Sequence, residues 1–361
     1  MKVLFLANSD EGLYQFRKEL VNEIKKNHEV VLCIPNGNFI SYFESIGCKV
    51  IITMMNRHGI NPFEEYRLLL NYKKILKNEK PDIVFTYTIK PNVYGGMACA
   101  SLNIPYVANI TGLGTAIENG GLMQKISLIL YKKGLKKAKK VFFQNRSNQE
   151  FMIGKGLVSG EYDLLPGSGV NVNQFTLLDY PSDYQICFTF IARLMKEKGI
   201  EQYLDAAEFI HEKYPNTLFY ICGSKEKEYD MTRLEQLISK GVVIYRGEVR
   251  DMIPIYQLSS CVIHPTYYPE GLSNVLLESC ACGRPIITTD RPGCREVVDD
   301  GINGFVVEAK NSNNLIEKIE LFLSKSNNER RQMGVEGRNK VEKEFNRQLV
   351  INKYLDEMDT I

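Results

Sequence analysis

Two glutamates with seven residues between them stand in the stretch YPEGLSNVLLESCACGRPII, residues 268–287. Glu270 lies in a loop, and Ser273 or a neighbour would cap the helix that follows. Glu278 lies two turns further on, on the same face as Asn274. Free N–H groups at a helix start favour an anion such as a diphosphate, and a carboxylate inside the helix can accept hydrogen bonds from hydroxyls. This combination suits a sugar nucleotide; the alternative is an amphipathic helix with two solvated acids.

Two cations, Arg193 and Lys198, occur in ARLMKEKGI between an expected strand at 186–191 and an expected helix at 200–213. Fixed cations at the carboxyl end of a strand would neutralise a diphosphate and hold a leaving phosphate as its charge grows. The alternative is a pair of surface charges at the start of a helix.

Two further loops follow strands in the same half of the chain. Gly223 ends one strand and would let a ligand approach the backbone closely. The loop RGEVRD, which begins at Arg246 and includes Val249 and Arg250, ends another strand and could contact the edge of a base. Because the carboxyl ends of parallel strands meet at one edge of a sheet, we expect these loops to converge with the two-glutamate stretch.

Short apolar runs alternate with helical patterns along the chain, which predicts parallel sheets with right-handed crossovers. The 361 residues are too many for one core, and the pattern restarts after the turn-rich segment 165–184. The expected fold class is therefore α/β, with two Rossmann-like domains at 1–170 and 185–340 joined by a linker at 171–184. Strands are expected at 3–7, 30–34, 50–53, 83–86, 106–110 and 140–144, and again at 186–191, 217–222, 242–245, 261–264 and 285–288.

Composition narrows the classes of function. A net charge of +2 argues against a nucleic-acid partner, and nine cysteines scattered through apolar segments indicate a reduced, cytoplasmic protein. Cys280, Cys282 and His264 do not predict a metal site, because positions two apart on a helix diverge. The apolar start MKVLFLA is too short for a signal peptide or a membrane span.

Five motifs in this order and spacing resemble the C-terminal half of a retaining glycosyltransferase of family 4 with the GT-B fold: FIARLMKEKGI, YICG, YRGEVRDM, YYPEGLSNVLLESCACGRPIITTD and GINGFVV. The resemblance covers roughly 190–307, and it implies two Rossmann-like domains whose parallel sheets face each other across a cleft. The first domain would bind the acceptor and the second the sugar nucleotide, with a C-terminal helix at 341–361 crossing back towards the first.

Roles for individual residues follow from the resemblance alone. It implies that Arg193 and Lys198 bind the donor diphosphate, while Glu270 and the amides of 271–273 hold the donor sugar. The remaining expected donor contacts, including the ribose contact of Glu278 and the base contacts of the 246–250 loop, are Gly12, Gly223, Arg246, Val249, Arg250, Gly271, Leu272, Ser273, Asn274 and Glu278.

On the acceptor side, loops 8–12, 87–92 and 111–115 follow strands of the first half. The expected acceptor contacts are Asn8, Tyr14, Thr111 and Lys90. Thr111 stands where many family members carry a histidine, and the sequence TGLG that it begins is similar to a subgroup building capsule, exopolysaccharide or lipid-linked glycans, especially N-acetylhexosaminyltransferases.

We therefore expect a UDP-sugar donor, an acceptor linked to polyprenyl diphosphate or polysaccharide, and no metal cofactor. Retention could arise by a covalent intermediate or by attack on the face that the phosphate leaves, and we favour the second. A basic pattern at 123–140, MQKISLILYKKGLKKAKK, can lie on an anionic membrane surface at the inner face of the plasma membrane. Its alternative is an ordinary sheet-covering helix with a solvated lysine face.

Two other classes of protein remain open from the sequence. A non-hydrolysing sugar-nucleotide epimerase has a similar two-domain arrangement, but it needs acid and base residues that we do not find. A noncatalytic protein that binds sugar nucleotides would release no nucleoside diphosphate with any acceptor.

Overall fold

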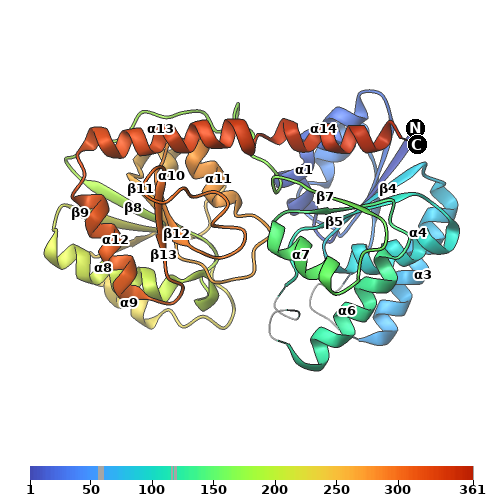
Figure 1. Cartoon of the computed structure of the whole chain (residues 1–361), viewed down its shortest axis with the longest axis horizontal. Coiled ribbons are helices and arrows are strands. Elements are labelled where there is room, and N and C mark those ends of the chain that lie inside the picture. Colours follow the sequence, from blue (N-terminus) through green and yellow to red (C-terminus); the bar gives the residue numbers. More distant parts are fainter. Residues whose placement is uncertain (56–60, 115–116, 118–119, 361) are drawn as a thin grey trace. The chain divides into compact units, whose positions relative to one another are not determined.

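The computed structural model describes residues 1–55, 61–114, 117 and 120–360 (Figure 1). They form two compact units, each built around one parallel sheet. The first unit comprises Met1–Ser168, Glu270–Leu272 and Gln348–Ile361, and the second comprises Gly169–Pro269 and Ser273–Arg347. The prediction of two Rossmann-like α/β domains is confirmed.

The sheet of the first unit has the strand order β3-β2-β1-β4-β5-β6-β7, and every neighbouring pair is parallel. Its central strands are continuous apolar runs because helices cover both faces. The strands are β1 Lys2–Leu6, β2 Glu29–Ile34, β3 Lys49–Ile52, β4 Ile83–Tyr87, β5 Tyr106–Ile110, β6 Lys140–Phe143 and β7 Glu161–Leu164.

Alternate residues of β1 serve two separate cores. Leu4 and Leu6 pack with the helices α3, α4 and α6, whereas Val3 and Phe5 pack with α1 and α14. The helices of this unit are α1 Asp10–Lys25, α2 Ile40–Ser45, α3 Pro62–Glu79, η1 Pro91–Gly95, α4 Gly96–Leu102, α6 Gly121–Leu135, α7 Arg146–Gly154 and α14 Arg347–Met358. The π-helix η1 runs directly into α4, where the sequence predicts one helix from 93 to 101.

The sheet of the second unit has the order β10-β9-β8-β11-β12-β13, again all parallel. Its strands are β8 Ile186–Ile191, β9 Thr217–Cys222, β10 Val243–Tyr245, β11 Cys261–His264, β12 Ile286–Thr289 and β13 Gly304–Val307. Its helices are η2 Lys196–Lys198, α8 Ile200–Lys213, α9 Thr232–Ser239, α10 Ile253–Leu258, α11 Asn274–Ala281, α12 Ser312–Leu323 and α13 Asn327–Glu344.

The C-terminal helix expected at 341–361 is interrupted, because its first residues belong to α13 and the rest of the helix is α14. α13 ends at Glu344, and the amide of Val170 donates to the carbonyl of Phe345 at 2.8 Å while the amide of Arg347 donates to the carbonyl of Val170 at 3.0 Å. These backbone hydrogen bonds engage the carbonyl and amide groups that would otherwise have continued the helix.

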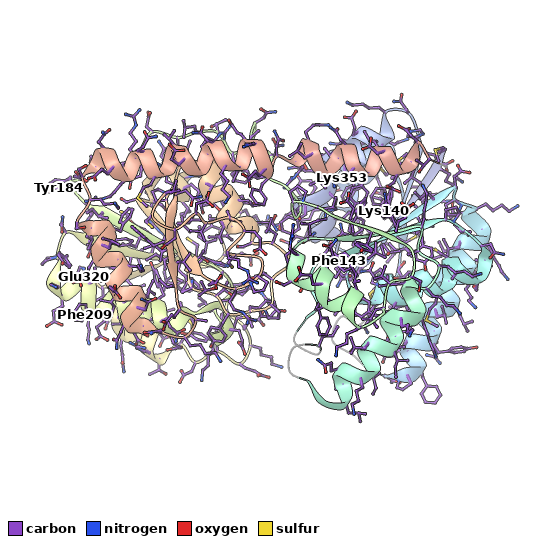
Figure 2. The ribbon with its side chains drawn as sticks, in the orientation of Figure 1. Lys140, Phe143, Tyr184, Phe209, Glu320 and Lys353 are labelled. Carbon is purple, nitrogen blue, oxygen red and sulfur yellow. The ribbon has the colours of Figure 1, made fainter. Side chains whose placement is uncertain are left out.

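Ion pairs hold α14 on the sheet of the first unit. Lys140 of β6 pairs with Glu357, and Lys353 pairs with Asp163 of β7; both lysines are labelled in Figure 2. The buried ring of Tyr354 lies between these pairs along the same helix.

Candidate active site

Loops at the carboxyl ends of β8, β9, β10 and β11 bind one another through their backbones. The amide of Leu194 donates to the carbonyl of Ser224 at 2.9 Å, and the amide of Gly223 donates to the carbonyl of Gly247 at 2.7 Å. The amide of Tyr267, beyond β11, donates to the carbonyl of Glu197 at 2.8 Å. The loops after β8, β9, β10 and β11 therefore form one continuous edge of the second unit, whereas Glu270–Leu272 of the two-glutamate stretch belong to the first unit.

Both expected cations lie on this edge. Arg193 follows β8, is half exposed and forms an ion pair with Glu226 of the loop after β9. Lys198 lies in η2, and its Nζ is 4.8 Å from the centroid of the Tyr268 ring. Arg193 must exchange its carboxylate partner to bind an anion, whereas Lys198 is held over an aromatic face.

The backbone of Gly223 lies in close contact with another loop of the protein. A Cβ at this position, where φ is 151°, would lie 1.8 Å from the carbonyl oxygen of Ala192. The neighbouring loop therefore requires a glycine here, and the expected approach of a ligand to this backbone is not what fixes the residue type.

Glu278 lies within α11 and faces the buried side chain of Tyr256 on α10. The Tyr256 hydroxyl donates to Oε2 of Glu278 at 2.9 Å. Burial raises the pKa of Glu278 to about 7, although the hydrogen bond from Tyr256 and the charge of Arg347 oppose the increase. Near neutral pH this carboxyl is poised between its two protonation states, and hydroxyl donors from a ligand would favour the ionised one.

Helix α11 begins with Ser273 at its N-cap and Asn274 as its first residue. The Ser273 side chain makes no capping hydrogen bond, and its backbone amide donates to the carbonyl of Gly293 at 2.8 Å. The expected cap is present by position, but this amide is engaged within the protein.

The loop after β10, which is expected to contact the base, is largely exposed. Its first residue, Arg246, donates its backbone amide to the carbonyl of Ile221 at 2.9 Å, and its guanidinium lies 5.5 Å from the centroid of the Tyr220 ring. Arg246 and Arg250 are exposed and Val249 is half-buried.

Glu270, Gly271 and Leu272 belong to the first unit. The side-chain amide of Asn145 donates to the carbonyls of Glu270 at 3.1 Å and Gly271 at 2.6 Å. A Cβ on Gly271 would lie 2.0 Å from the carbonyl oxygen of Thr111, so only glycine fits beside the loop after β5. These contacts place Glu270 next to the Thr111 loop.

The other expected acceptor contacts lie near the carboxyl ends of β1 and β4 of the same sheet. Asn8 follows β1. Gly12, which is an expected donor contact, lies in the first turn of α1, where its amide donates to Oγ of the N-cap residue Ser9 at 3.0 Å. Tyr14 stacks on Phe39 with ring centroids 4.2 Å apart. The remaining contact is Lys90, which precedes η1 and pairs with Glu65 of α3. Thr115, at the end of the expected 111–115 loop, lies outside the described residues.

Asn145 and Tyr256 were missed by sequence reasoning. Asn145 is the second residue after β6, and a polar pair, Gln144-Asn145, at the end of a buried strand is a usable signal. Tyr256 gives no such signal, because it lies on the apolar face of a short helix.

Burial limits the protonation of His264 and the exposure of the cysteine thiols. Burial lowers the pKa of His264 to about 3, with a smaller contribution from the charge of Lys198, so the imidazole stays neutral. All nine cysteines are buried. Within the described part of the chain, His, Cys, Asp and Glu side chains do not gather in threes that could hold a metal ion.

The basic segment at 123–140 forms α6 up to Leu135, and the helix runs through Gly134. Leu128, Leu130 and Leu135 face the core, whereas Ile126 and Ile129 are exposed. Over residues 1–55, 61–114, 117 and 120–360, the structure contains no helix with the length and apolar content needed to cross a bilayer.

Comparison with known proteins agrees with these two units. Residues 181–340 match the family model described as glycosyl transferases group 1, and residues 2–145 match glycosyl transferase 4-like. Over 341 residues the chain is 28% identical to the N,N'-diacetylbacillosaminyl-diphospho-undecaprenol alpha-1,3-N-acetylgalactosaminyltransferase of Campylobacter jejuni, covering 90% of this chain and 89% of that protein. It is 23% identical over 307 residues to the UDP-Gal:alpha-D-GlcNAc-diphosphoundecaprenol alpha-1,3-galactosyltransferase of Escherichia coli, covering 80% and 78%.

Among solved structures, Anabaena HepE in complex with UDP superposes with a TM-score of 0.82 at 18% identity, covering all of both chains. This likeness shows the fold. The two matched segments together span most of the sequence, and the protein is a glycosyltransferase of the GT-B fold, a member of the family 4-like, group 1 glycosyltransferases.

Proposed function

We propose that this enzyme transfers a sugar, an N-acetylhexosamine, from a UDP-sugar to a polyprenyl-diphosphate-linked or polysaccharide acceptor, with retention of configuration. The observation that carries the proposal is the shared carboxyl edge of the second sheet, where loops bearing Arg193 and Lys198 are bonded to their neighbours. Support for the donor and the acceptor comes from the names of the Campylobacter and Escherichia relatives and from the UDP complex of HepE.

In the proposed donor site, Arg193 and Lys198 bind the diphosphate. Glu278 accepts hydrogen bonds from the ribose, beside Asn274, and the loop from Arg246 through Val249 to Arg250 contacts the base. Glu270 and the amides of Gly271 to Ser273 hold the sugar; the Ser273 amide must leave the Gly293 carbonyl to take part.

Transfer breaks the bond between the anomeric carbon and the phosphate oxygen. The electron pair stays on the departing UDP, whose growing charge Arg193 and Lys198 stabilise. The acceptor hydroxyl forms the new bond on the same face, and its proton passes to the leaving phosphate oxygen. Glu270 orients the sugar in this scheme, and two cations meet the diphosphate without a metal ion.

The first unit is the proposed acceptor domain, at 1–170, and the donor domain is 185–340, with the linker at 171–184 and the helical tail at 341–361. Asn8, Tyr14, Lys90 and Thr111 are the proposed acceptor contacts. A polyprenyl-linked acceptor requires access to lipid, so we place the enzyme at the inner face of the plasma membrane, bound peripherally through 123–140.

The experiment is to incubate the enzyme with UDP-GlcNAc, UDP-GalNAc, UDP-Glc or UDP-Gal and a polyprenyl-diphosphate-linked sugar. We expect UDP release that depends on the acceptor, a glycolipid heavier by one N-acetylhexosamine, and an α-linkage by NMR. Conversion of the donor without an acceptor would indicate an epimerase, and binding without UDP release over a broad acceptor panel would indicate a noncatalytic protein.

A further inference from the structure

Helix α3 presents an apolar stripe to solvent on the side opposite its core contacts. Phe63, Tyr66 and Leu70 follow helical spacing and are exposed, with Phe63 80% accessible. The core face of the same helix is already occupied by Leu68, Tyr72, Ile75 and Leu76. A helix that is apolar on both sides in water lacks a partner for one of them.

The second half of the same outward stripe is basic. Lys74 and Lys77 are exposed and Lys73 is half-buried, each one or two turns beyond Leu70. α3 thus changes along its outer face from apolar, near its start, to cationic.

Helix α6 repeats this pattern. Its outward stripe begins with Leu122, which is 73% accessible, continues through Ile126 and Ile129, and ends with the exposed Lys133 and Lys136. The sequence of α6 contains no acidic residue. The two helices therefore carry the same apolar-then-basic order, although their sequences are unrelated in detail.

Both helices start from the same edge of the sheet. α3 follows β3 and α6 follows β5, and in a parallel α/β unit a helix begins at the carboxyl edge of the strands. Each packs against η1 and α4, which are continuous in the chain, so the two helices flank one shared helical segment (Figure 1). The apolar ends of both helices consequently lie at the carboxyl edge of the first sheet, where the proposed acceptor contacts lie. The lysines of both helices lie further from this edge.

We propose that α3 joins α6 in one lipid-binding surface, the lipid face, defined by Phe63, Tyr66, Leu70, Leu122, Ile126 and Ile129. This rests on the proposed function, because it names how that enzyme reaches a lipid-linked acceptor. The apolar ends enter the boundary of the acyl chains, and the lysines of both helices contact anionic headgroup phosphates. The charge of the two stripes is complementary to an anionic bilayer, which selects this occupant.

The test measures binding of the full-length protein to vesicles of phosphatidylcholine alone or mixed with phosphatidylglycerol. One variant carries Phe63→Ser, Tyr66→Ser and Leu70→Ser, and a second carries Leu122→Ser, Ile126→Ser and Ile129→Ser. The control carries Phe209→Ser and Leu321→Ser, two exposed apolar positions on α8 and α12 of the second unit, the first labelled in Figure 2.

Each triple variant should weaken binding to anionic vesicles by about tenfold or more, as the loss of three inserted side chains requires. The control should bind like the wild type, and added salt should weaken binding of the wild type. Wild-type binding by the α3 variant overturns the inference. The inference is also overturned if the wild type binds no vesicles but self-associates, and the α3 variant does not self-associate. A second copy of the chain would then cover the surface.

A water-soluble acceptor with a short polyprenyl chain separates this inference from the proposed function. The α3 variant should transfer sugar to that acceptor at the wild-type rate and lose transfer only on vesicles. If the wild type transfers no sugar to either acceptor, the proposed function fails, while vesicle binding still decides the role of α3.

Discussion

The hydroxyl of Tyr256 donates to Oε2 of Glu278 at 2.9 Å, joining two helices of the second unit at the carboxylate proposed to hold the donor ribose. Tyr256 itself is anchored from the other side, because Nε of the buried Arg284 donates to its carbonyl at 2.7 Å. Glu278 therefore presents its carboxylate from a fixed frame. Positioning a carboxylate in this way limits the ordering that a ligand must impose.

Tyr256→Phe removes this donor while keeping the ring. We expect the KM for the UDP-sugar to rise about three- to tenfold with a small change in kcat, because the hydrogen bond serves binding in the ground state and the transition state alike. The control is Tyr203→Phe, which removes hydroxyl bonds to the carbonyls of Phe188 and Tyr220 in the same unit. Both should lose stability, but only Tyr256→Phe should change the KM. A KM that moves equally in both variants would show a general structural effect.

In the proposed donor site, the raised pKa of Glu278, about 7, predicts that donor binding depends on pH. Ribose hydroxyls donate to the ionised carboxylate, so affinity for UDP should fall as pH decreases through 7 and Glu278 takes up a proton. Titration calorimetry at pH 6 and pH 8 tests this for the wild type and Glu278→Gln. The variant should bind UDP more weakly at pH 8 and should lose this component of the pH dependence; an unchanged profile in the variant would contradict the assignment.

The same group affects folding stability with the opposite dependence on pH. Its pKa is raised in the folded protein above the ordinary value of 4.5, so the folded state binds the proton more tightly. The favourable contribution is complete below the unfolded pKa and is lost as pH rises through about 7. Glu278→Gln should therefore change the free energy of unfolding of the unliganded protein more favourably at pH 8 than at pH 5. The difference between the two changes should be about 1–2 kcal/mol. Denaturant unfolding at the two values measures the difference, and a variant equally stabilised at both would argue against the raised pKa.

Glu226 forms an ion pair with Arg193, so in the proposed donor site it would compete with the diphosphate for the guanidinium. Glu226→Gln should free the guanidinium and tighten UDP binding about two- to fivefold, since the pair is exposed and its own attraction is weak. Glu320→Gln is the matched control, because Glu320 pairs with Lys213 at 2.6 Å elsewhere on the unit and is labelled in Figure 2. Weaker UDP binding in Glu226→Gln would mean that the carboxylate orients Arg193 instead of blocking it.

Asn145 links the cap of α7 to the Glu270 loop. Its Oδ1 accepts from the amide of Asn148 at 2.8 Å, while its Nδ2 donates to the carbonyls of Glu270 and Gly271. Asn145→Asp keeps the cap and removes the donors, so kcat should fall about tenfold or more while the affinity for UDP changes little. Asn311→Asp, at the cap of α12, controls for the change of charge at a helix start. A wild-type kcat in Asn145→Asp would remove the Glu270 loop from the reaction.

Most of the fold follows from the apolar runs, because strands buried on both faces are continuous in the sequence. β7 and β13 were missed. Residues Glu161 and Tyr162 of β7 are exposed at the sheet edge, so no apolar run marks that strand, and β13 is only four residues long and begins with a glycine. The C-terminal helix was expected to run from 341, and its break at Phe345 could not be predicted because it depends on backbone bonds to Val170, far away in the sequence.

The candidate site was likewise predictable from the sequence only in part. Chain order predicts that Arg193 and Lys198 follow a strand, whereas Glu278 was singled out by its spacing from Glu270 on a helix. Contacts between distant residues could not be predicted, because the pairs Tyr256–Glu278 and Asn145–Gly271 depend on side chains that only packing brings together.

The central claim is that cations at the carboxyl edge of the second sheet stabilise the departing diphosphate. Its most direct measurement is the rate of UDP release with donor and acceptor for Lys198→Ala and for Lys196→Ala, an exposed lysine in the same short helix η2. We predict that Lys198→Ala lowers kcat/KM about 100-fold or more, with Lys196→Ala near the wild type. Wild-type turnover in Lys198→Ala, or equal losses in the two variants, would contradict it.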